Sequence, residues 1–420
     1  MLGGVRRSAI SHAQGRLARG LAVAAIGLLA TAGVAGAAQP GTALTEPPAE
    51  LARALDCHGD LRGAALAPVI LVHGTGSSPE ESFSFGYAHA LPLLGFPVCT
   101  VRLPAHGLVD MQRSFEYVVH AIREVARRSD RRVSLVGHSQ GAVLATYAPY
   151  FWPDLPALVD DVVGLAGPYR GTTASDSSCA GGSCPPFAWQ FRPRSNLNRA
   201  FAGRAAPAGP SFTAIATSFD ELVTPAPQAG LLPGASNVVL QDVCALRPIE
   251  HFTLVGDAVA YALAVDALTH PGPADPARVS RTTCLQALMP GADLVRAAAV
   301  APVAIAGAAL RIATTPGVAR EPQLRCPFDA AACPPPQLRL TRRCAGGGRL
   351  RIALTGDVDV VREVDFKLGR RLIRRDIAPP FVTSLARSAR RPATRRLRAV
   401  ATLGAPGGGR VILARPLPRC

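Results

Sequence analysis

Short runs of apolar residues recur through the middle of the chain and alternate with longer segments of mixed polarity. Near-continuous apolar runs of this length are typical of strands in a parallel sheet that is covered on both faces. The runs that predict such strands are Ala67–Val72, Val98–Leu103, Arg132–Val136, Val162–Ala166, Phe212–Thr217 and Val238–Val243. The alternation therefore predicts an α/β domain with a mostly parallel sheet and helices on both faces.

Several segments between and after these runs have the pattern of helices. Apolar side chains recur at helical intervals over Ser114–Arg128, and Ala142–Trp152 follows a glycine-rich turn. Ala297–Leu310 is an apolar segment bounded by two arginines and interrupted by a proline, which predicts a buried or surface-capping helix rather than a membrane span. Gly164–Pro210, rich in Gly, Ser, Pro and Cys, predicts an irregular cap or loop region.

The C-terminal part of the chain has a different pattern, in which short runs alternate between apolar and polar positions. Several short strands in so few residues predict a small all-β sandwich of antiparallel strands. The runs are Gln337–Thr341, Arg349–Leu354, Val358–Lys367, Phe381–Leu385, Arg396–Leu403 and Arg410–Leu413. We therefore expect an α/β domain over residues 39–318, a linker over 319–336 and a small β-sandwich module over 337–420.

The first 38 residues have the features of a secretory signal peptide. Four arginines precede an apolar run over residues 21–34, and Ala35-Gly36-Ala37 follows as a small-residue cleavage pattern. The alternative is a membrane anchor, because residues 21–38 carry no charge. The alanine-rich composition and the small residues that follow favour the signal peptide, and hence a secreted protein.

Composition and charge narrow the class of protein. With 420 residues, 48% of them hydrophobic, and a mean hydropathy of +0.21, the chain has enough apolar surface for large folded cores, which excludes a fibrous or disordered protein. The net charge is +16, and residues 321–420 hold 21 basic side chains against 7 acidic ones. This asymmetry predicts an anionic partner for the C-terminal module, such as an envelope polymer or a lipid surface. Nucleic acid is not expected, because no recognition motif accompanies the charge.

All ten cysteines follow the predicted cleavage point, and none has the paired spacing of a zinc site. In an extracellular protein an even number of cysteines indicates disulfides. Cys179 and Cys184 are predicted to close a tight loop, and Cys326 and Cys333 to close the linker, although the pairing among Cys326, Cys333, Cys344 and Cys420 is left open. The full set is Cys57, Cys99, Cys179, Cys184, Cys244, Cys284, Cys326, Cys333, Cys344 and Cys420.

One motif carries candidate catalytic chemistry. Residues 137–141 read GHSQG, the pattern of a nucleophile elbow, in which glycines flank a serine on a strained strand-to-helix turn. A predicted strand precedes the motif and a predicted helix follows it. Ser139 is therefore the candidate nucleophile.

A serine nucleophile needs a base and an acid, which follow it along the chain in this fold. His251 lies in the loop after the Val238–Val243 run and is the candidate base, whereas His270 is expected at the surface. Asp220 follows the Phe212–Thr217 run at the carboxyl edge of the sheet and is the candidate acid. Glu221 is the alternative, because adjacent side chains point in different directions.

The oxyanion formed during acyl transfer needs two backbone N–H donors. The residue after the nucleophile, Gln140, supplies one, and the turn VHGTG at residues 72–76 supplies the other, with Thr75 best placed. His73 and His138 are expected to be structural or pocket-lining side chains, and His106 a surface residue or one satisfied by hydrogen bonds. No metal site and no cofactor are expected.

These residues resemble the α/β-hydrolase lipases, within them the group similar to Candida antarctica lipase B, from about Cys57 to Cys326. The resemblance implies a triad of Ser139, Asp220 and His251 with an oxyanion hole at Thr75 and Gln140. It also implies disulfides Cys57–Cys99 and Cys244–Cys284 and an alanine-rich helix walling the entrance. Segments VDFKLG at 364–369 and APPF at 378–381 are similar to bacterial immunoglobulin-like modules. The matching segments of the first domain are VHGTG, GHSQG, AGPYRGT at 166–172, AWQ at 188–190, TSFDE at 217–221, QDVC at 241–244 and IEH at 249–251.

The sequence thus predicts a secreted serine hydrolase that cleaves carboxylic esters, as a lipase or esterase, through an acyl-enzyme, with a lipid or ester substrate. Alternatives with the same triad are a polyester depolymerase and an acyltransferase. An alternative of another class is a cell-envelope binding protein with a vestigial hydrolase domain, which the arginine-rich C-terminus motivates.

Overall fold

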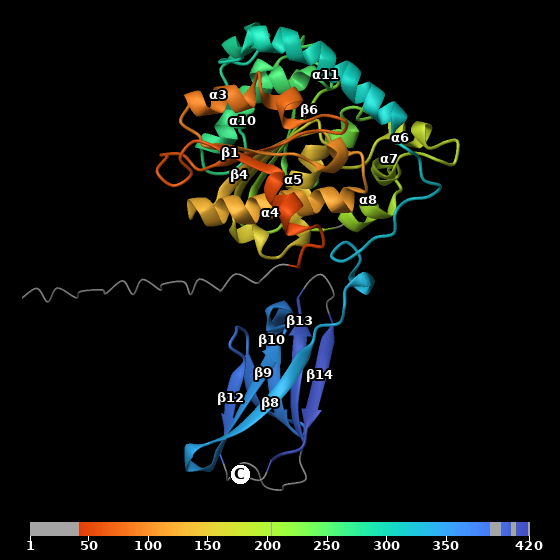
Figure 1. The fold of residues 1–420 in the computed structure, drawn as a ribbon. Coiled ribbons are helices and arrows are strands. Elements are labelled where there is room, and N and C mark those ends of the chain that lie inside the picture. Colours follow the sequence, from red (N-terminus) through yellow and green to blue (C-terminus); the bar gives the residue numbers. More distant parts are fainter. Residues whose placement is uncertain (1–41, 203, 387–395, 405–408, 419–420) are drawn as a thin grey trace, which may run out of the picture. The chain divides into compact units, whose positions relative to one another are not determined.

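A computed structural model describes residues 42–202, 204–386, 396–404 and 409–418. The predicted signal peptide lies outside the described residues. The described chain contains two kinds of architecture: a mixed, mostly parallel sheet with helices, and two antiparallel sheets formed by the C-terminal residues (Figure 1). This confirms the predicted fold class, an α/β hydrolase followed by a small all-β part.

The first sheet has seven strands in the order β1-β3-β2-β4-β5-β6-β7. All neighbouring strands are parallel except β1, which pairs with β3 in antiparallel orientation. The sequence pattern missed β1 because its four residues, LDCH, alternate between half-buried and exposed and form no apolar run. The strands are β1 (Leu55–His58), β2 (Val69–Val72), β3 (Val98–Val101), β4 (Val133–His138), β5 (Val159–Leu165), β6 (Ser211–Ala216) and β7 (Ser236–Val239).

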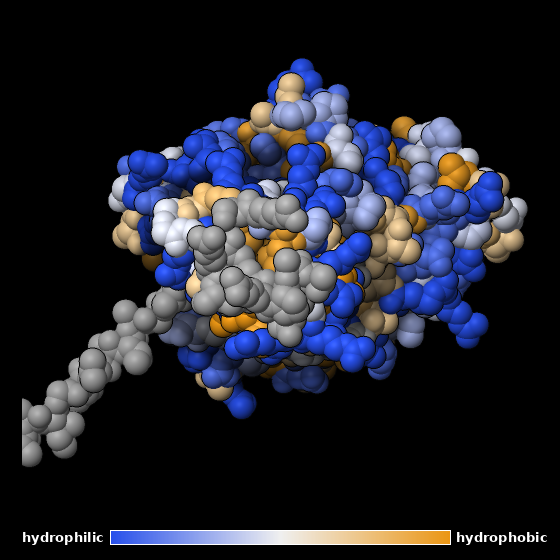
Figure 2. Space-filling view, turned by 90° about the horizontal axis from the view of Figure 1, so that it is seen from below, coloured by the Kyte–Doolittle hydropathy of each residue, from blue (hydrophilic) through white to orange (hydrophobic). Residues whose placement is uncertain are grey.

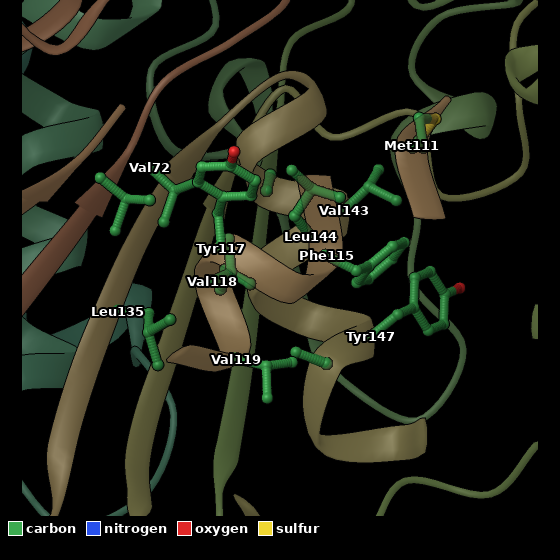
Figure 3. Close-up of a cluster of buried hydrophobic side chains, with 14 of the residues drawn as sticks. Val72, Met111, Phe115, Tyr117, Val118, Val119, Leu135, Val143, Leu144 and Tyr147 are labelled. Carbon is green, nitrogen blue, oxygen red and sulfur yellow. The ribbon is translucent and has the colours of Figure 1, made fainter. Parts of the chain in front are cut away.

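Helices cover both faces of this sheet because alternate strand residues point to opposite sides. Ile70 and Val72 of β2 pack with α4 (Met111–Ser129) and α5 (Gln140–Phe151), in the cluster drawn in Figure 3. Val69 and Leu71 face the other way and pack with α3 (Tyr87–Leu93) and α10 (Ala258–Thr269). Apolar and aromatic side chains make up both clusters. The strands therefore appear in the sequence as continuous apolar runs. The remaining helices of this region are α1 (Pro48–Arg53), α2 (Pro79–Phe83), α6 (Thr173–Ser178), α7 (Pro186–Phe191), α8 (Asn196–Phe201), α9 (Leu240–Val243) and α11 (Leu294–Thr314).

Two elements differ from their sequence-based prediction. The Val238–Val243 run was predicted as one strand, but β7 ends at Val239 and the chain turns into the short helix α9. The region Gly164–Pro210, predicted as irregular, contains α6, α7 and α8. These helices have six residues each, too short for an amphipathic period to stand out among Gly, Ser and Pro.

Helix α11 is longer than the apolar segment that predicts it. Among the described residues it is the one helix with the length and apolar composition of a membrane span. In the structure its alanine side lies over the sheet domain, as Ala308 is buried. Its outer side exposes Val295, Val303 and Leu310 to more than half. The helix is therefore a surface-capping element, as the sequence analysis predicts.

The C-terminal residues form two antiparallel sheets that enclose a separate apolar core. Leu350, Ile352, Phe366 and Leu397 are completely buried in this core. The sequence pattern missed β11, because its residues RLIRRD are mostly exposed. On the side of the molecule drawn in Figure 2, hydrophilic residues cover most of the visible surface. One sheet contains β8 (Leu338–Ala345), β9 (Arg349–Gly356) and β12 (Val382–Leu385), and the other contains β10 (Val361–Leu368), β11 (Arg371–Asp376), β13 (Leu397–Leu403) and β14 (Arg410–Arg415).

The predicted linker is partly anchored on the first core. Phe328 is buried and packs against Phe115, Phe151 and Trp152. The backbone N–H of Arg325 also donates to the side-chain oxygen of Gln112 on α4, at 2.6 Å. The segment after α11 therefore contributes to the stability of the α/β core.

Four disulfides lie within the described residues. Both pairings implied by the resemblance are present, and so are the two short loops suggested by the spacing. Cys420 lies outside the described residues. The pairs are Cys57–Cys99, Cys179–Cys184, Cys244–Cys284 and Cys326–Cys333.

The two long-range disulfides are predicted to carry most of the disulfide stabilisation. Cys57–Cys99 and Cys244–Cys284 join residues 42 and 40 positions apart, so each should stabilise the fold by roughly 3–4 kcal/mol on the loop-entropy estimate. Urea denaturation should show that the free energy of unfolding of the double variant Cys57→Ser/Cys99→Ser is lower by that amount.

The control is Cys179→Ser/Cys184→Ser, whose partners lie only 5 positions apart and which should lose roughly half as much. Equal losses in the two double variants would contradict the loop-entropy account.

Candidate active site

The candidate nucleophile lies in a tight turn between β4 and α5. Ser139 has φ 55° and ψ −119°, a conformation that L-residues rarely adopt. A Cβ on Gly137 would lie 2.4 Å from the backbone oxygen of Gly141, and a Cβ on Gly141 would lie 2.0 Å from that of Val72. No side chain fits at such distances, so both positions require glycine. The glycines let α5 begin against the end of β2, which holds Ser139 at the carboxyl edge of the sheet.

The candidate base and acid form a buried pair beside this turn. Nδ1 of His251 lies 3.0 Å from each carboxylate oxygen of Asp220. The same carboxylate accepts the backbone N–H groups of Leu222 and Val223. Burial raises the pKa of Asp220, but the hydrogen bonds from His251 and the backbone outweigh it and hold the pKa below its ordinary value. Asp220 is therefore held as a carboxylate that fixes the proton on Nδ1 of His251 and leaves Nε2 free.

The alternative acid, Glu221, occupies a different place. Its Oε2 accepts the backbone N–H of His251 at 3.2 Å and does not contact the imidazole. The adjacent carboxylates thus diverge, as expected from their positions in the chain. Glu221 holds the backbone of the loop, whereas Asp220 holds the ring.

Ser139 and His251 line the same cavity. Within the described part of the chain, Ser139 Oγ has no hydrogen-bond partner, so the contact between nucleophile and base is not formed here. Catalytic hydrogen bonds of this kind are often loose without substrate and tighten when substrate binds. The candidate nucleophile and base thus share one cavity, and the candidate acid is hydrogen-bonded to the base.

The turn after β2 is held by side chains on several sides. His73 is completely buried, donates from Nδ1 to the Gly74 carbonyl at 2.8 Å and accepts the Leu103 N–H at Nε2. The N–H of Gly76 donates to the His106 carbonyl. Thr75, between these anchors, lines the cavity. Gln140 is the first residue of α5, where a backbone N–H has no partner within the helix. The two predicted oxyanion donors thus come from turns that meet at Ser139.

Sequence reasoning missed a tether between α11 and this turn. Arg311 donates to the carbonyl of Gly76 and forms a two-pronged ion pair with Glu81 of α2. Gly76 approaches α11 so closely that a Cβ there would lie 3.1 Å from the Ala308 carbonyl oxygen. Burial raises the pKa of Glu81, but Arg311 outweighs it and lowers the pKa overall. The sequence marks Arg311 only as the end of an apolar run and gives no sign of a partner 230 residues away.

The cavity has a volume of about 510 Å³ and is mostly apolar. One wall is the alanine-rich side of α11, and another comes from α7 and the loop that carries Asp220. This agrees with the walling helix that the resemblance implies. The wall residues include Ala297, Ala301, Ala304, Ala308, Ile312, Phe187, Phe191 and Leu222.

The remaining histidines lie apart from this chemistry. His270 is half exposed and pairs with Asp266 at the end of α10, as predicted for a surface residue. His106 is half-buried and satisfied by a hydrogen bond, since its Nδ1 contacts the Ser77 carbonyl beside the turn that contains Thr75. Among the described residues, no group of His, Cys, Asp and Glu side chains has the arrangement of a metal site.

A comparison with protein-family models gives no match. A comparison with known proteins gives lipase B of Pseudozyma antarctica, which is 29% identical over 293 residues, covering 67% of this chain and 85% of that protein. Among solved structures, lipase B of Aspergillus fumigatus matches with a TM-score of 0.62 and 25% identity, covering 68% of this chain and 72% of that one. The comparison of sequences and the comparison of structures therefore both give a lipase B as a similar protein.

The neutral buried imidazoles predict a loss of stability in mild acid. Burial lowers the pKa of His73 to about 4, and burial with the nearby His251 lowers that of His138 to about 3. Their ordinary pKa is about 6.5, so below that pH the unfolded chain binds more protons than the folded one and the free energy of unfolding falls. For each pH unit below about 6.5, each histidine should lower the free energy of unfolding by up to about 1.4 kcal/mol.

Urea unfolding from about pH 7 to about pH 5 measures this slope. The glutamine in His138→Gln does not titrate. The free energy of unfolding of this variant should therefore fall less steeply with pH, by the contribution of one histidine. An identical slope in the variant would mean that His138 is not held neutral in the folded protein.

Proposed function

We propose that this lipase-B-like α/β hydrolase, a carboxylic ester hydrolase, works through an acyl-enzyme formed on Ser139. The observation that carries the proposal is the buried His251–Asp220 pair, whose imidazole lines the same cavity as a serine on a nucleophile elbow. The mostly apolar cavity suits the acyl chain of an ester or lipid substrate.

In the first half of the reaction, Ser139 Oγ attacks the ester carbonyl carbon while Nε2 of His251 takes the hydroxyl proton. Asp220 keeps the other ring proton on Nδ1 and stabilises the imidazolium that forms. The backbone N–H groups of Thr75 and Gln140 stabilise the oxyanion. The C–O bond to the alcohol then breaks, and His251 returns its proton to the leaving alcohol oxygen.

In the second half, water enters beside His251 and the steps repeat. His251 takes one proton from the water as its oxygen bonds to the acyl carbon. The Ser139–acyl bond breaks, the proton returns to Ser139 Oγ, and the carboxylic acid leaves. The same residues thus serve both halves of the reaction.

We also propose that the protein acts outside the cell. The N-terminal 38 residues have the signal-peptide pattern, and the four disulfides within the described residues suit an oxidising compartment.

Removing any member of the triad should nearly abolish ester hydrolysis. Ser139→Ala, Asp220→Asn and His251→Ala should each lower kcat by about a thousandfold or more, and the double variants little further, because the three residues act as a unit. Initial rates on a nitrophenyl butyrate ester measure this.

The matched control is Glu221→Gln, which changes the neighbouring carboxylate and should leave most of the activity. A collapse in Glu221→Gln with near wild-type rates in Asp220→Asn would move the acid to Glu221. Wild-type protein without ester hydrolysis would instead support the vestigial-hydrolase alternative.

For the C-terminal module we propose binding to an anionic envelope polymer, because arginines are the only charged residues on strands β8, β9 and β12 of one sheet. Leu350 and Ile352 of β9 point into the core, so Arg349 and Arg351 point outward. On β8, Arg343 lies directly across from Arg351. Like charges in such a pair destabilise a sheet unless an anion lies over them.

These guanidinium groups have no acidic partner within the described residues, although that of Arg349 donates a hydrogen bond to Ser384. Arg339, Arg343, Arg349 and Arg351 are all exposed, and none forms an ion pair with a described residue. On the other sheet, by contrast, Arg375 pairs with Asp365 and Glu363, and Lys367 pairs with Asp365. The cationic face has no exposed large apolar side chain for insertion into a bilayer, which favours a flexible polymer over a membrane.

Retention on immobilised polyphosphate tests this proposal. The full chain should bind at low salt and elute as salt rises, since the Debye length shrinks from about 8 Å at physiological salt to about 3 Å at 1 M. Arg343→Gln/Arg351→Gln should elute at clearly lower salt.

The control, Arg362→Gln/Arg398→Gln, removes the same charge from exposed positions of the other sheet and should elute close to wild type. Equal shifts in both double variants would show that net charge alone is responsible. Stronger binding to phosphatidylglycerol vesicles than to polyphosphate would favour a lipid surface.

A further inference from the structure

A second imidazole lies against the proposed base. His138 is the last residue of β4, immediately before Ser139, and its side chain is buried. Its ring centroid lies 4.9 Å from that of His251. Its Nε2 lies 3.0 Å from the backbone carbonyl oxygen of His251. The residue is therefore held by the loop that carries the base.

This contact determines which nitrogen of His138 carries the proton. A carbonyl oxygen only accepts hydrogen bonds, so Nε2 must be the donor. Burial and the neighbouring His251 keep the pKa of His138 far below neutral, at about 3, so the ring carries one proton only. Nδ1 of His138 is therefore a hydrogen-bond acceptor with a free lone pair.

Nδ1 of His138 lies beside the proposed nucleophile. A Cβ built on Gly74 would lie 3.2 Å from this nitrogen and 3.0 Å from Cβ of Ser139. No described residue donates a hydrogen bond to Nδ1. Nδ1 is also not one of the side-chain atoms that are both inaccessible to solvent and without a hydrogen-bond partner among the described residues. Gly74, His138 and Ser139 all line the cavity. Nδ1 is therefore an acceptor without a protein partner, located where substrate binds.

The chemistry assigns this acceptor to one part of the substrate. In the proposed reaction His251 must deliver its proton to the alcohol oxygen as the ester bond breaks. The alcohol part therefore leaves past the His251 ring, against which His138 packs. The acyl chain fits the apolar wall formed by residues such as Phe187 and Leu222.

We propose that Nδ1 of His138 accepts a hydrogen bond from a hydroxyl group on the alcohol part of the ester. The preferred substrates are then esters of diols and of glycerol that keep a free hydroxyl next to the ester oxygen. This inference rests on the proposed acyl-enzyme function and names its substrate class. In a mostly apolar cavity an acceptor left unpaired costs free energy, so a substrate without the hydroxyl should react more slowly.

Three butyrate esters of nearly equal size test this inference. 2-Hydroxyethyl butyrate offers the donor, propyl butyrate lacks it, and 2-fluoroethyl butyrate lacks it while withdrawing electrons as a hydroxyl does. We expect kcat/KM for the hydroxyethyl ester to exceed that of both others by about tenfold, the effect of one net hydrogen bond. The fluoroethyl ester separates hydrogen bonding from leaving-group reactivity.

Two variants of His138 test the roles of its two ring nitrogens separately. His138→Gln keeps an N–H donor near the position of Nε2 and loses the acceptor, so the hydroxyethyl preference should fall to about one. His138→Asn keeps an oxygen acceptor near the position of Nδ1 and loses the contact with the His251 carbonyl. It should keep much of the preference at a lower kcat.

Equal kcat/KM for the hydroxyethyl and fluoroethyl esters in the wild type would overturn the inference, whether or not the variants fold. An undiminished preference in His138→Gln would also overturn it. The proposed function fails differently, through absence of hydrolysis of all three esters or through an active Ser139→Ala.

Discussion

The close contact between the start of α5 and the end of β2 is the constraint on which the active site depends. Gly141 lies so near the backbone oxygens of Val72 and His73 that no side chain fits between them. This contact forces Ser139 into its unusual conformation and brings the first N–H groups of α5 next to the turn that contains Thr75. A single packing requirement thus positions both the proposed nucleophile and the proposed oxyanion donors.

Around that contact, the site is stabilised by elements far apart in sequence. Asp220 and Glu221 hold different atoms of His251, and His138 holds its backbone carbonyl from the opposite side. Arg311 joins the helix that walls the cavity to the turn beside Thr75. A single side chain thus connects the entrance of the cavity to the turn that contains a proposed oxyanion donor.

The sequence predicts those features that depend on local pattern. Buried parallel strands appear as apolar runs, and the elbow appears as GHSQG because its glycines are sterically required. Features that depend on side-chain direction were not predictable. The contact of Glu221 with the His251 backbone, the acceptor nitrogen of His138 and the Arg311–Gly76 contact follow from how distant segments pack. The sequence pattern did not predict the half-exposed strand β1, because this strand is held by its pairing with β3 and by a disulfide rather than by apolar side chains.

Covalent trapping of the nucleophile tests the central claim most directly. A fluorophosphonate reacts with a serine only where a base and an oxyanion hole activate it. The account predicts one adduct per chain, located on the peptide that contains Ser139, and no adduct in Ser139→Ala. An adduct on another residue, or equal labelling of folded Ser139→Ala, would contradict it.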